Sequence, residues 1–173
     1  DKNVAGRARG LPIDLVHAPS AVKPRKNAPE ELWQEYRRQQ ELNRVSAVAA
    51  ERLQFLKRQV GGKTIICAVD GGFTNKTVFR HIPDHTILIG RIRKDARLFD
   101  VPEPTLARRG RKRWYGEALH TPEQVRQNTG IPWQAVSAYA SGTHHQFEVK
   151  ALPAVRWQGT GDKTVSVIII RPL

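Results

Sequence analysis

The 173-residue chain contains no methionine and only one cysteine, Cys67. A single cysteine excludes an intramolecular disulfide framework and a zinc site built from several cysteines. No apolar run approaches the roughly 18–20 residues that a membrane-spanning helix needs, so we expect no membrane partner. The polar, basic start Asp1–Gly10 is unlike a signal peptide. The lack of methionine, together with the apolar end Val165–Leu173, leads us to expect a piece of a larger protein rather than a chain with its natural start.

Acidic residues are also scarce. The chain has 29 Lys and Arg against 16 Asp and Glu, a formal net charge of +13. Such an excess indicates a polyanionic partner such as DNA or RNA and says little about the fold. Nine cations and three anions lie between Arg91 and Arg113, so this short stretch alone carries +6. In its densest part, Arg108–Tyr115, five cations flank Gly110 and two aromatic residues follow. Cations neutralise phosphates and aromatic rings stack on bases, which makes this segment a candidate nucleic-acid contact, with a solvated basic loop as the alternative.

Hydrophobic residues make up 39% of the chain, which is enough for a packed core. In the first half, the residue pattern predicts strands at 11–17, 63–69 and 85–91, a long helix from Pro29 to about Arg58 and a short helix at 74–80. The last two strands and the short helix between them form a βαβ unit, so these strands should be parallel. In the second half, it predicts a helical turn after Pro122 and strands at 133–140, 144–152, 154–158 and 163–171. The predicted fold is therefore α/β at first and then β-rich and antiparallel.

Asp70 is the sharpest candidate for chemistry. It follows the apolar run 63–69 and precedes Gly71 and Gly72, which places its carboxylate at the carboxyl end of the predicted sheet. Ligand and metal sites in open α/β sheets gather at that end, and divalent cations prefer carboxylate oxygens. The alternative is a structural aspartate that accepts backbone hydrogen bonds in an Asp-Gly-Gly turn.

Other residues that could carry chemistry have simpler interpretations. Cys67 lies inside the same strand as a buried, inert thiol. Asp14 is expected to face solvent, and Gly159–Asp162 reads as a turn rather than a phosphate loop. His144 and His145 are neighbours in a strand and so point to opposite faces, which makes them a poor metal chelate.

Three segments in order resemble bacterial insertion-sequence transposases of the DDE type. They are Val69–Asn75 after an apolar strand, Ile87–Leu98, and Arg109–Gly116. Val155–Trp157 and Ile168–Leu173 are also similar to that family. The resemblance runs from about residue 60 to the end of the chain, and its specificity comes from the order and spacing of the motifs.

The resemblance implies a partial RNase H-like core, a mixed sheet with flanking helices, over residues 1–95. It implies a β-rich antiparallel insertion that returns towards the core over residues 96–173. In the family, three carboxylates hold two divalent ions, Mg²⁺ or Mn²⁺, which activate water or a DNA 3′-hydroxyl for attack on a phosphodiester. Asp70 matches the second carboxylate. The residues expected to bind DNA are Arg91, Arg93, Lys94, Arg108, Arg109, Arg111, Lys112, Arg113 and Trp114.

The other two carboxylates of the family have no match in this chain. The first belongs to an earlier strand, a place that Asp14 does not take, and the third is a glutamate that would follow Leu173. We therefore expect this chain alone to bind DNA rather than cut it, and the intact enzyme to cleave and join transposon-end DNA. The implied partners are transposon ends, target DNA and further copies of the protein, in the nucleoid of a bacterial cytoplasm. The alternative is a non-catalytic basic nucleic-acid-binding module, either a truncated or domesticated relative or a nucleoprotein component.

Overall fold

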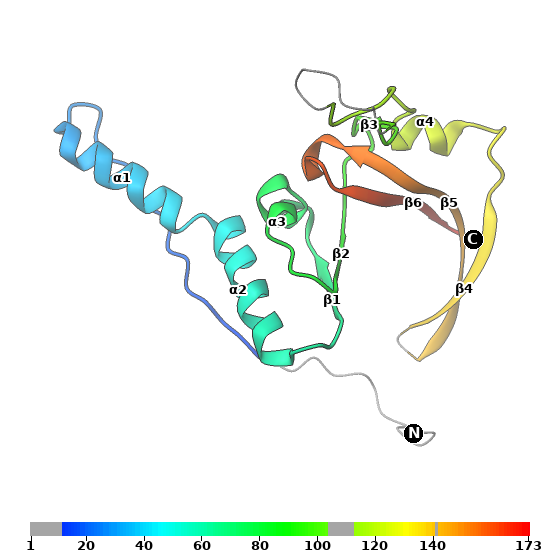
Figure 1. Cartoon of the computed structure of the whole chain (residues 1–173), viewed down its shortest axis with the longest axis horizontal. Helices are drawn as coiled ribbons and strands as arrows, with labels where there is room; N and C mark the ends of the chain where they lie inside the picture. Colours follow the sequence, from blue (N-terminus) through cyan, green and yellow to red (C-terminus); the bar gives the residue numbers. More distant parts are fainter. Residues whose placement is uncertain (1–11, 104–112, 141) are drawn as a thin grey trace. The chain divides into compact units, whose positions relative to one another are not determined.

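The computed structural model describes residues 12–103, 113–140 and 142–173, and this part of the chain forms two compact units. The parallel-sheet unit comprises residues 15–92 and 159–161. The antiparallel-sheet unit comprises residues 12–14, 93–158 and 162–173, as far as they are described. Helices and sheets together make the chain a mixed α/β protein (Figure 1). Among the described residues, no helix combines the length and the apolarity needed to cross a membrane.

The strand predicted at 11–17 is wrong over its described part. Residues 12–17 have no regular secondary structure, and the side chains of Ile13 and Leu15 are exposed. A strand needs a neighbour to satisfy its backbone hydrogen-bonding groups, and this segment belongs to neither sheet of the described chain.

Two helices replace the single helix predicted from Pro29. They are α1 (Glu30–Leu42) and α2 (Val45–Val60), and the break falls at Asn43 and Arg44, where Arg44 adopts an extended conformation. No side chain of α1 is buried. Most helical stability in proteins comes from packing, and within the described chain no buried side chain fixes α1 in line with α2. α2 ends at Val60, close to the predicted Arg58, and is followed by Gly61, whose φ of 59° favours glycine.

The predicted parallel strand pair is confirmed. β1 (Ile65–Val69) and β2 (Thr86–Gly90) run parallel, with Ile65 opposite Thr86 and Val69 opposite Gly90. They are connected by the 3₁₀ turn η1 (Gly71–Phe73) and the short helix α3 (Lys76–Arg80). Because parallel strands end at the same edge, the residues that follow β1 and β2 lie at one carboxyl edge of the sheet.

One face of this parallel pair is apolar and exposed. Ile66 lies opposite Ile87 and Ala68 lies opposite Ile89, and all four side chains are open to solvent. The exposed fraction of Ile66 reaches 69%. Parallel sheets are normally covered on both faces, whereas this pair is packed on only one side within the described chain.

The antiparallel sheet contains four strands in the described chain. They are β3 (Leu98–Phe99), β4 (Gln134–Ala140), β5 (Thr143–Trp157) and β6 (Thr164–Pro172). β5 is the central strand: β4 and β3 pair with successive parts of one of its edges, and β6 pairs with the other (Figure 1). The predicted antiparallel character of this region is confirmed, while β3 was not predicted.

β5 is one long strand where the sequence predicted two. The register with β6 shifts between Leu152 and Val155, a bulge that contains Pro153. Proline lacks an N–H donor and is tolerated in strands at bulges, so it bends the strand without ending it. The carbonyl oxygen of Pro153 accepts a hydrogen bond of 2.7 Å from Ser166 Oγ on β6, which ties the bulge to the neighbouring strand.

The short helix α4 (Pro122–Gln127) lies against the antiparallel sheet and shares its core. Thr121 and Gln124 form a capping box, which fixes the start of the helix. The most buried apolar side chains of this unit come from the helix and from three strands: Leu98, Val125, Val155 and Val167. The helix predicted after Pro122 is thus confirmed, and its inner side closes one face of the sheet.

Lys150 on β5 is almost fully buried beneath α4, with 3% of its surface exposed. Its ammonium group donates hydrogen bonds to three carbonyl oxygens at the end of α4, those of Val125 (3.0 Å), Arg126 (3.2 Å) and Asn128 (2.7 Å). The ammonium also lies 4.6 Å from the centre of the Trp133 ring. A positive charge at the carboxyl end of a helix satisfies its free carbonyl groups and favours its dipole. Lys150 therefore links the end of α4 to the centre of the sheet.

Glu123 gives α4 a dependence on pH. Hydrogen bonds from Arg126 and then Gln127 lower the pKa of the Glu123 carboxyl to about 2. A carboxyl whose pKa is lower in the folded state stabilises the fold above its unfolded pKa, and that contribution disappears as the pH falls towards the folded pKa. We expect the urea midpoint, followed by circular dichroism, to fall between about pH 4.5 and 2. The Glu123→Gln variant should lose part of this change, and an unchanged pH profile in that variant would contradict the assignment.

Candidate functional site

Asp70 caps the turn that follows β1. Its Oδ1 accepts a hydrogen bond of 2.6 Å from the Gly71 N–H, and its main-chain carbonyl accepts one of 2.9 Å from the Phe73 N–H. The side chain is exposed at the carboxyl edge of the parallel sheet, where the sequence placed it. The structural interpretation of Asp70 as a turn-forming residue is therefore correct. Its exposure leaves the carboxylate accessible to a ligand as well.

Thr74 and Gly90 hold this turn against the end of β2. Thr74 is buried, and its hydroxyl donates to the Asp70 carbonyl oxygen over 3.3 Å. A Cβ atom added to Gly90 would lie 2.1 Å from Thr74 Oγ1 and 3.0 Å from Val69 Cγ2. Glycine at position 90 is thus needed for the close approach of the Asp70 turn to the strand.

We expect Gly90→Ala to destabilise the parallel-sheet unit by about 2 kcal/mol, because the new methyl group overlaps the Thr74 hydroxyl. Chemical denaturation measures the change. Gly72→Ala is the matched control, since a Cβ atom there meets no atom within 4 Å. Equal stability of the two variants would show that the turn does not need the contact between Thr74 and Gly90.

Arg91 lies beside Asp70 at the same edge. It follows the last residue of β2, and a Cβ atom on Gly71 would lie 3.6 Å from the Arg91 carbonyl oxygen. The Arg91 side chain is exposed and forms no ion pair with Asp70. A carboxylate and a guanidinium are therefore both available to solvent at one end of the sheet.

Arg93 and Lys94 belong to the antiparallel-sheet unit rather than to the edge with Asp70. Arg93 forms a two-pronged ion pair with Asp95, at 2.9 and 3.0 Å, which raises the pKa of Arg93 and lowers the pKa of Asp95. This pair reduces the positive charge that Arg93 offers to a polyanion. Lys94 is exposed, and its carbonyl oxygen accepts the Glu123 N–H at the start of α4. Of the two, Lys94 is the more available cation.

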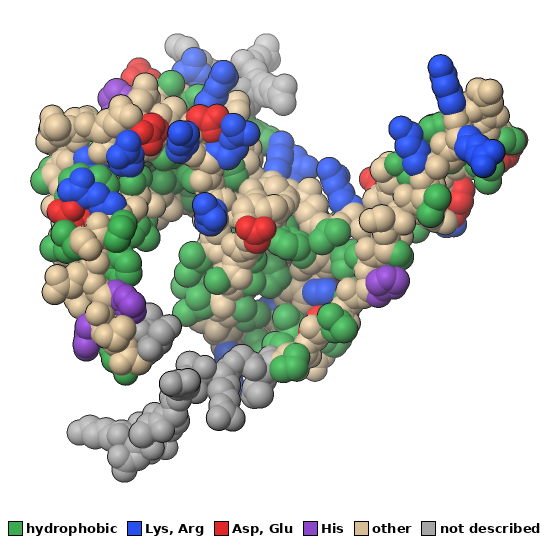
Figure 2. All heavy atoms as spheres, turned by 180° about the vertical axis from the view of Figure 1, so that it is seen from behind, with side chains coloured by type: hydrophobic (Ala, Val, Ile, Leu, Met, Phe, Trp, Pro, Cys, Tyr) green, Lys and Arg blue, Asp and Glu red, His purple; other side chains and the backbone are tan. Residues whose placement is uncertain are grey.

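Four of the predicted DNA-binding residues, Arg108, Arg109, Arg111 and Lys112, lie outside the described residues. At the end of the same basic segment, Arg113 is exposed and Trp114 is 36% exposed. Tyr115 packs on Phe99 of β3 with ring centres 4.9 Å apart, which attaches this end of the segment to the sheet. On the face drawn in Figure 2, Lys and Arg side chains form several separate groups with Asp and Glu among them.

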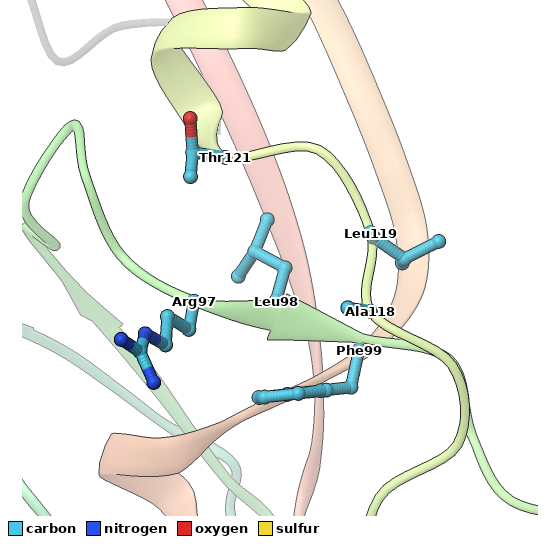
Figure 3. A pocket seen from close by; sticks show the side chains of 6 residues that line it. All are labelled: Arg97, Leu98, Phe99, Ala118, Leu119 and Thr121. Carbon is cyan, nitrogen blue, oxygen red and sulfur yellow. The ribbon is translucent and has the colours of Figure 1, made fainter.

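A cavity of about 290 Å³ lies between β3 and the start of α4 (Figure 3). Its lining residues are Arg97, Leu98, Phe99, Ala118, Leu119 and Thr121. Arg97 and Phe99 point to one side of β3 and Leu98 to the other, as expected for alternating side chains in a strand. The lining is mostly apolar, and Arg97 is its one charged residue.

The described residues do not form a divalent-metal site. No group of three or more His, Cys, Asp or Glu side chains comes together in the described part of the chain. Mg²⁺ and Mn²⁺ are held by several oxygen ligands, and within the described chain Asp70 belongs to no group of three such side chains. Asp70 and the described residues around it thus do not suffice to hold the two ions that the sequence resemblance implies.

The remaining candidates join no group of three metal-ligating side chains among the described residues. Cys67 is half-buried, and burial raises the pKa of its thiol, which favours the unreactive protonated form. His144 packs edge-on against Tyr139, and His145 stacks with Phe147, so the two imidazoles have separate surroundings. Asp14 is exposed in the segment without regular structure.

Sequence reasoning did not single out Lys150 or Arg156. Both lie in predicted strands, where a basic residue is expected to face solvent. The local sequence does not reveal that these two side chains are covered, because the atoms that cover them belong to other elements. Arg156 stands between Val155 and Trp157, and this apolar setting is the one local signal for it.

No protein-family model, no curated protein and no solved structure matches this chain.

Proposed function

We propose that this chain binds DNA as part of a DDE-type transposase, in which Asp70 supplies one of the catalytic carboxylates. The observation that carries the proposal is the position of Asp70 at the carboxyl edge of a parallel strand pair, beside the exposed Arg91. The net charge of +13 supports a polyanionic partner, and the order of the motifs from Val69 onwards supports this family.

The edge with Asp70 has the chemistry to receive a phosphodiester. The Arg91 guanidinium would pair with a phosphate oxygen, which places the phosphate next to the Asp70 carboxylate. On the antiparallel-sheet unit, the cations Lys94 and Arg113 and the indole of Trp114 would contact the backbone and bases of DNA. A Mg²⁺ or Mn²⁺ ion would take Asp70 as one ligand, and its other ligands would come from outside the described residues.

A second function is a non-catalytic DNA-binding module. It is favoured by the surroundings of Asp70, which joins no group of three or more His, Cys, Asp or Glu side chains in the described chain. In that case Asp70 only caps the turn, and the basic surface alone accounts for the activity.

The Asp70→Asn variant of the full-length natural protein separates the two functions. Asparagine caps turns as well as aspartate does, so the hydrogen bond to Gly71 and the fold should persist. We expect loss of Mg²⁺- or Mn²⁺-dependent nicking of a labelled duplex, with DNA affinity unchanged.

The matched control is Asp84→Asn, which removes an exposed carboxylate near the opposite, amino end of β2. This variant should cleave like the natural protein. Cleavage by Asp70→Asn would show that Asp70 is not catalytic. If the natural protein binds DNA without cutting it in either metal, the binding-module function is correct.

A further inference from the structure

Arg156 is half-buried, and part of its guanidinium group lacks a hydrogen-bond partner. Its Nε and Nη1 atoms are shielded from solvent and donate no hydrogen bond to any described group. The guanidinium also forms no ion pair within the described chain. An arginine stays charged at every accessible pH, and burying such a charge without an acceptor is unfavourable. The unpaired Nε and Nη1 atoms of Arg156 therefore suit an anionic ligand.

Within the described chain, Arg156 has a second cation on its face of the sheet and forms no ion pair with an acidic residue. Arg156 lies on β5 between Phe99 of β3 and Thr164 of β6, so these three side chains share one face of the sheet. Arg97 points to the same side of β3 as Phe99 and is exposed (Figure 3).

The carboxylates of the neighbouring strands are directed elsewhere. Asp100 follows Phe99 directly and so points to the opposite side of the sheet. Glu148 is bound to Arg171, with 2.5 Å between Oε2 and Nε. Asp162 lies in the exposed turn before β6 and makes no hydrogen bond to Arg156.

We propose that Arg156 and Arg97 form an oxyanion site that takes a phosphate group of the DNA backbone. The fork of N–H donors on a guanidinium matches two oxygens of a phosphate, and a second guanidinium offsets the remaining charge. The Thr164 hydroxyl on the same face adds a neutral donor. This inference rests on the proposed DNA binding. It assigns one DNA contact to the antiparallel-sheet unit, whereas Asp70 belongs to the parallel-sheet unit.

The test compares Arg156→Gln and Arg156→Lys with the natural sequence in duplex-DNA titrations at several salt concentrations. If Arg156→Gln loses one phosphate contact, the slope of log K against log [salt] becomes less steep by about 0.9. This change corresponds to a roughly fivefold weaker affinity near 0.15 M salt. Arg156→Lys keeps the charge but loses the fork of N–H donors, so its DNA affinity should lie between those of the natural sequence and Arg156→Gln. Arg126→Gln is the control, because it removes an exposed guanidinium that is already paired with Glu123 on α4.

Thermal unfolding without DNA shows whether Arg156 has a structural role instead. Removal of an unpaired, partly buried charge should leave the melting temperature of Arg156→Gln equal to or above that of the natural chain. A clearly lower melting temperature would overturn the site, because it would mean that Arg156 holds the sheet together.

The outcomes separate this site from the proposed function. If the natural chain binds DNA and Arg156→Gln has the same affinity and slope, the site is wrong and DNA binding stands. If the natural chain does not bind DNA, yet inorganic phosphate raises the melting temperature of the natural chain and not of Arg156→Gln, the site holds free phosphate and the DNA function fails. If neither ligand acts, both proposals are overturned.

Discussion

Replacing Lys150 with methionine is expected to lower the free energy of unfolding of the antiparallel-sheet unit by about 3 kcal/mol. Methionine keeps most of the length and apolar character of the side chain but removes the ammonium group. Three carbonyl oxygens at the end of α4, from Val125, Arg126 and Asn128, then lose their hydrogen bonds from a charged donor. Buried carbonyl groups that lose their partners cost more than the mean value of a hydrogen bond, because water does not replace the donor.

Hydrogen exchange and urea unfolding together check this prediction. The amide protons of α4 should exchange faster in Lys150→Met, and the urea midpoint of the antiparallel-sheet unit should fall. The control is Lys26→Met, which makes the same chemical change at an exposed loop position and should leave both measurements unchanged. A fully stable Lys150→Met variant with normal α4 protection would show that the three hydrogen bonds contribute no net stability.

Lys150 illustrates what local sequence patterns do not contain. The strand around it was predicted from apolar and β-branched residues, and the structure confirms a strand there. The burial of Lys150 depends instead on carbonyl groups that lie 22 to 25 residues earlier in the chain. A lysine in a half-buried strand is expected to face solvent unless a helix end happens to lie above it.

The elements that were predicted correctly have strong local signals. β1 and β2 are short apolar runs ended by Asp70 and Gly90, and α4 has its capping residues in place. The helix break at Asn43 and the two-residue strand β3 have no such signal. Both depend on which surfaces pack against each other, and this is a property of the folded chain rather than of a short window of sequence.

The candidate site also contains features that the sequence predicted and features that it did not. The position of Asp70 followed from an apolar run and a glycine-rich turn, and its cap on Gly71 matches the structural alternative. The basic stretch after β2 was predicted as one DNA-binding element, yet Arg91 and Arg93 belong to different units. Arg93 is also paired with Asp95. The sequence shows this acidic residue two positions after Arg93 but does not show the ion pair. Charge counting predicts a polyanionic partner and does not tell which cations are free.

Reversing the charge of Arg109, Arg111 and Arg113 together is expected to weaken binding to duplex DNA by at least about 100-fold near 0.15 M salt. Three lost phosphate contacts lower the slope of log K against log [salt] by about 2.7, and the new glutamates add repulsion. Arg109 and Arg111 lie outside the described residues, and Arg113 is exposed at the end of the same segment. Fluorescence anisotropy of a labelled duplex at several salt concentrations measures both affinity and slope.

The matched control reverses Lys23, Arg25 and Lys26, three exposed cations of a loop in the other unit. Both triple variants change the net charge by the same amount, so a difference between them reports position rather than total charge. If the segment around Arg111 touches DNA directly, only its variant loses the full slope, while the control shows the weaker effect of a lower overall charge. Equal losses in the two variants would instead mean that DNA responds to the +13 of the whole chain and that this segment is no dedicated contact.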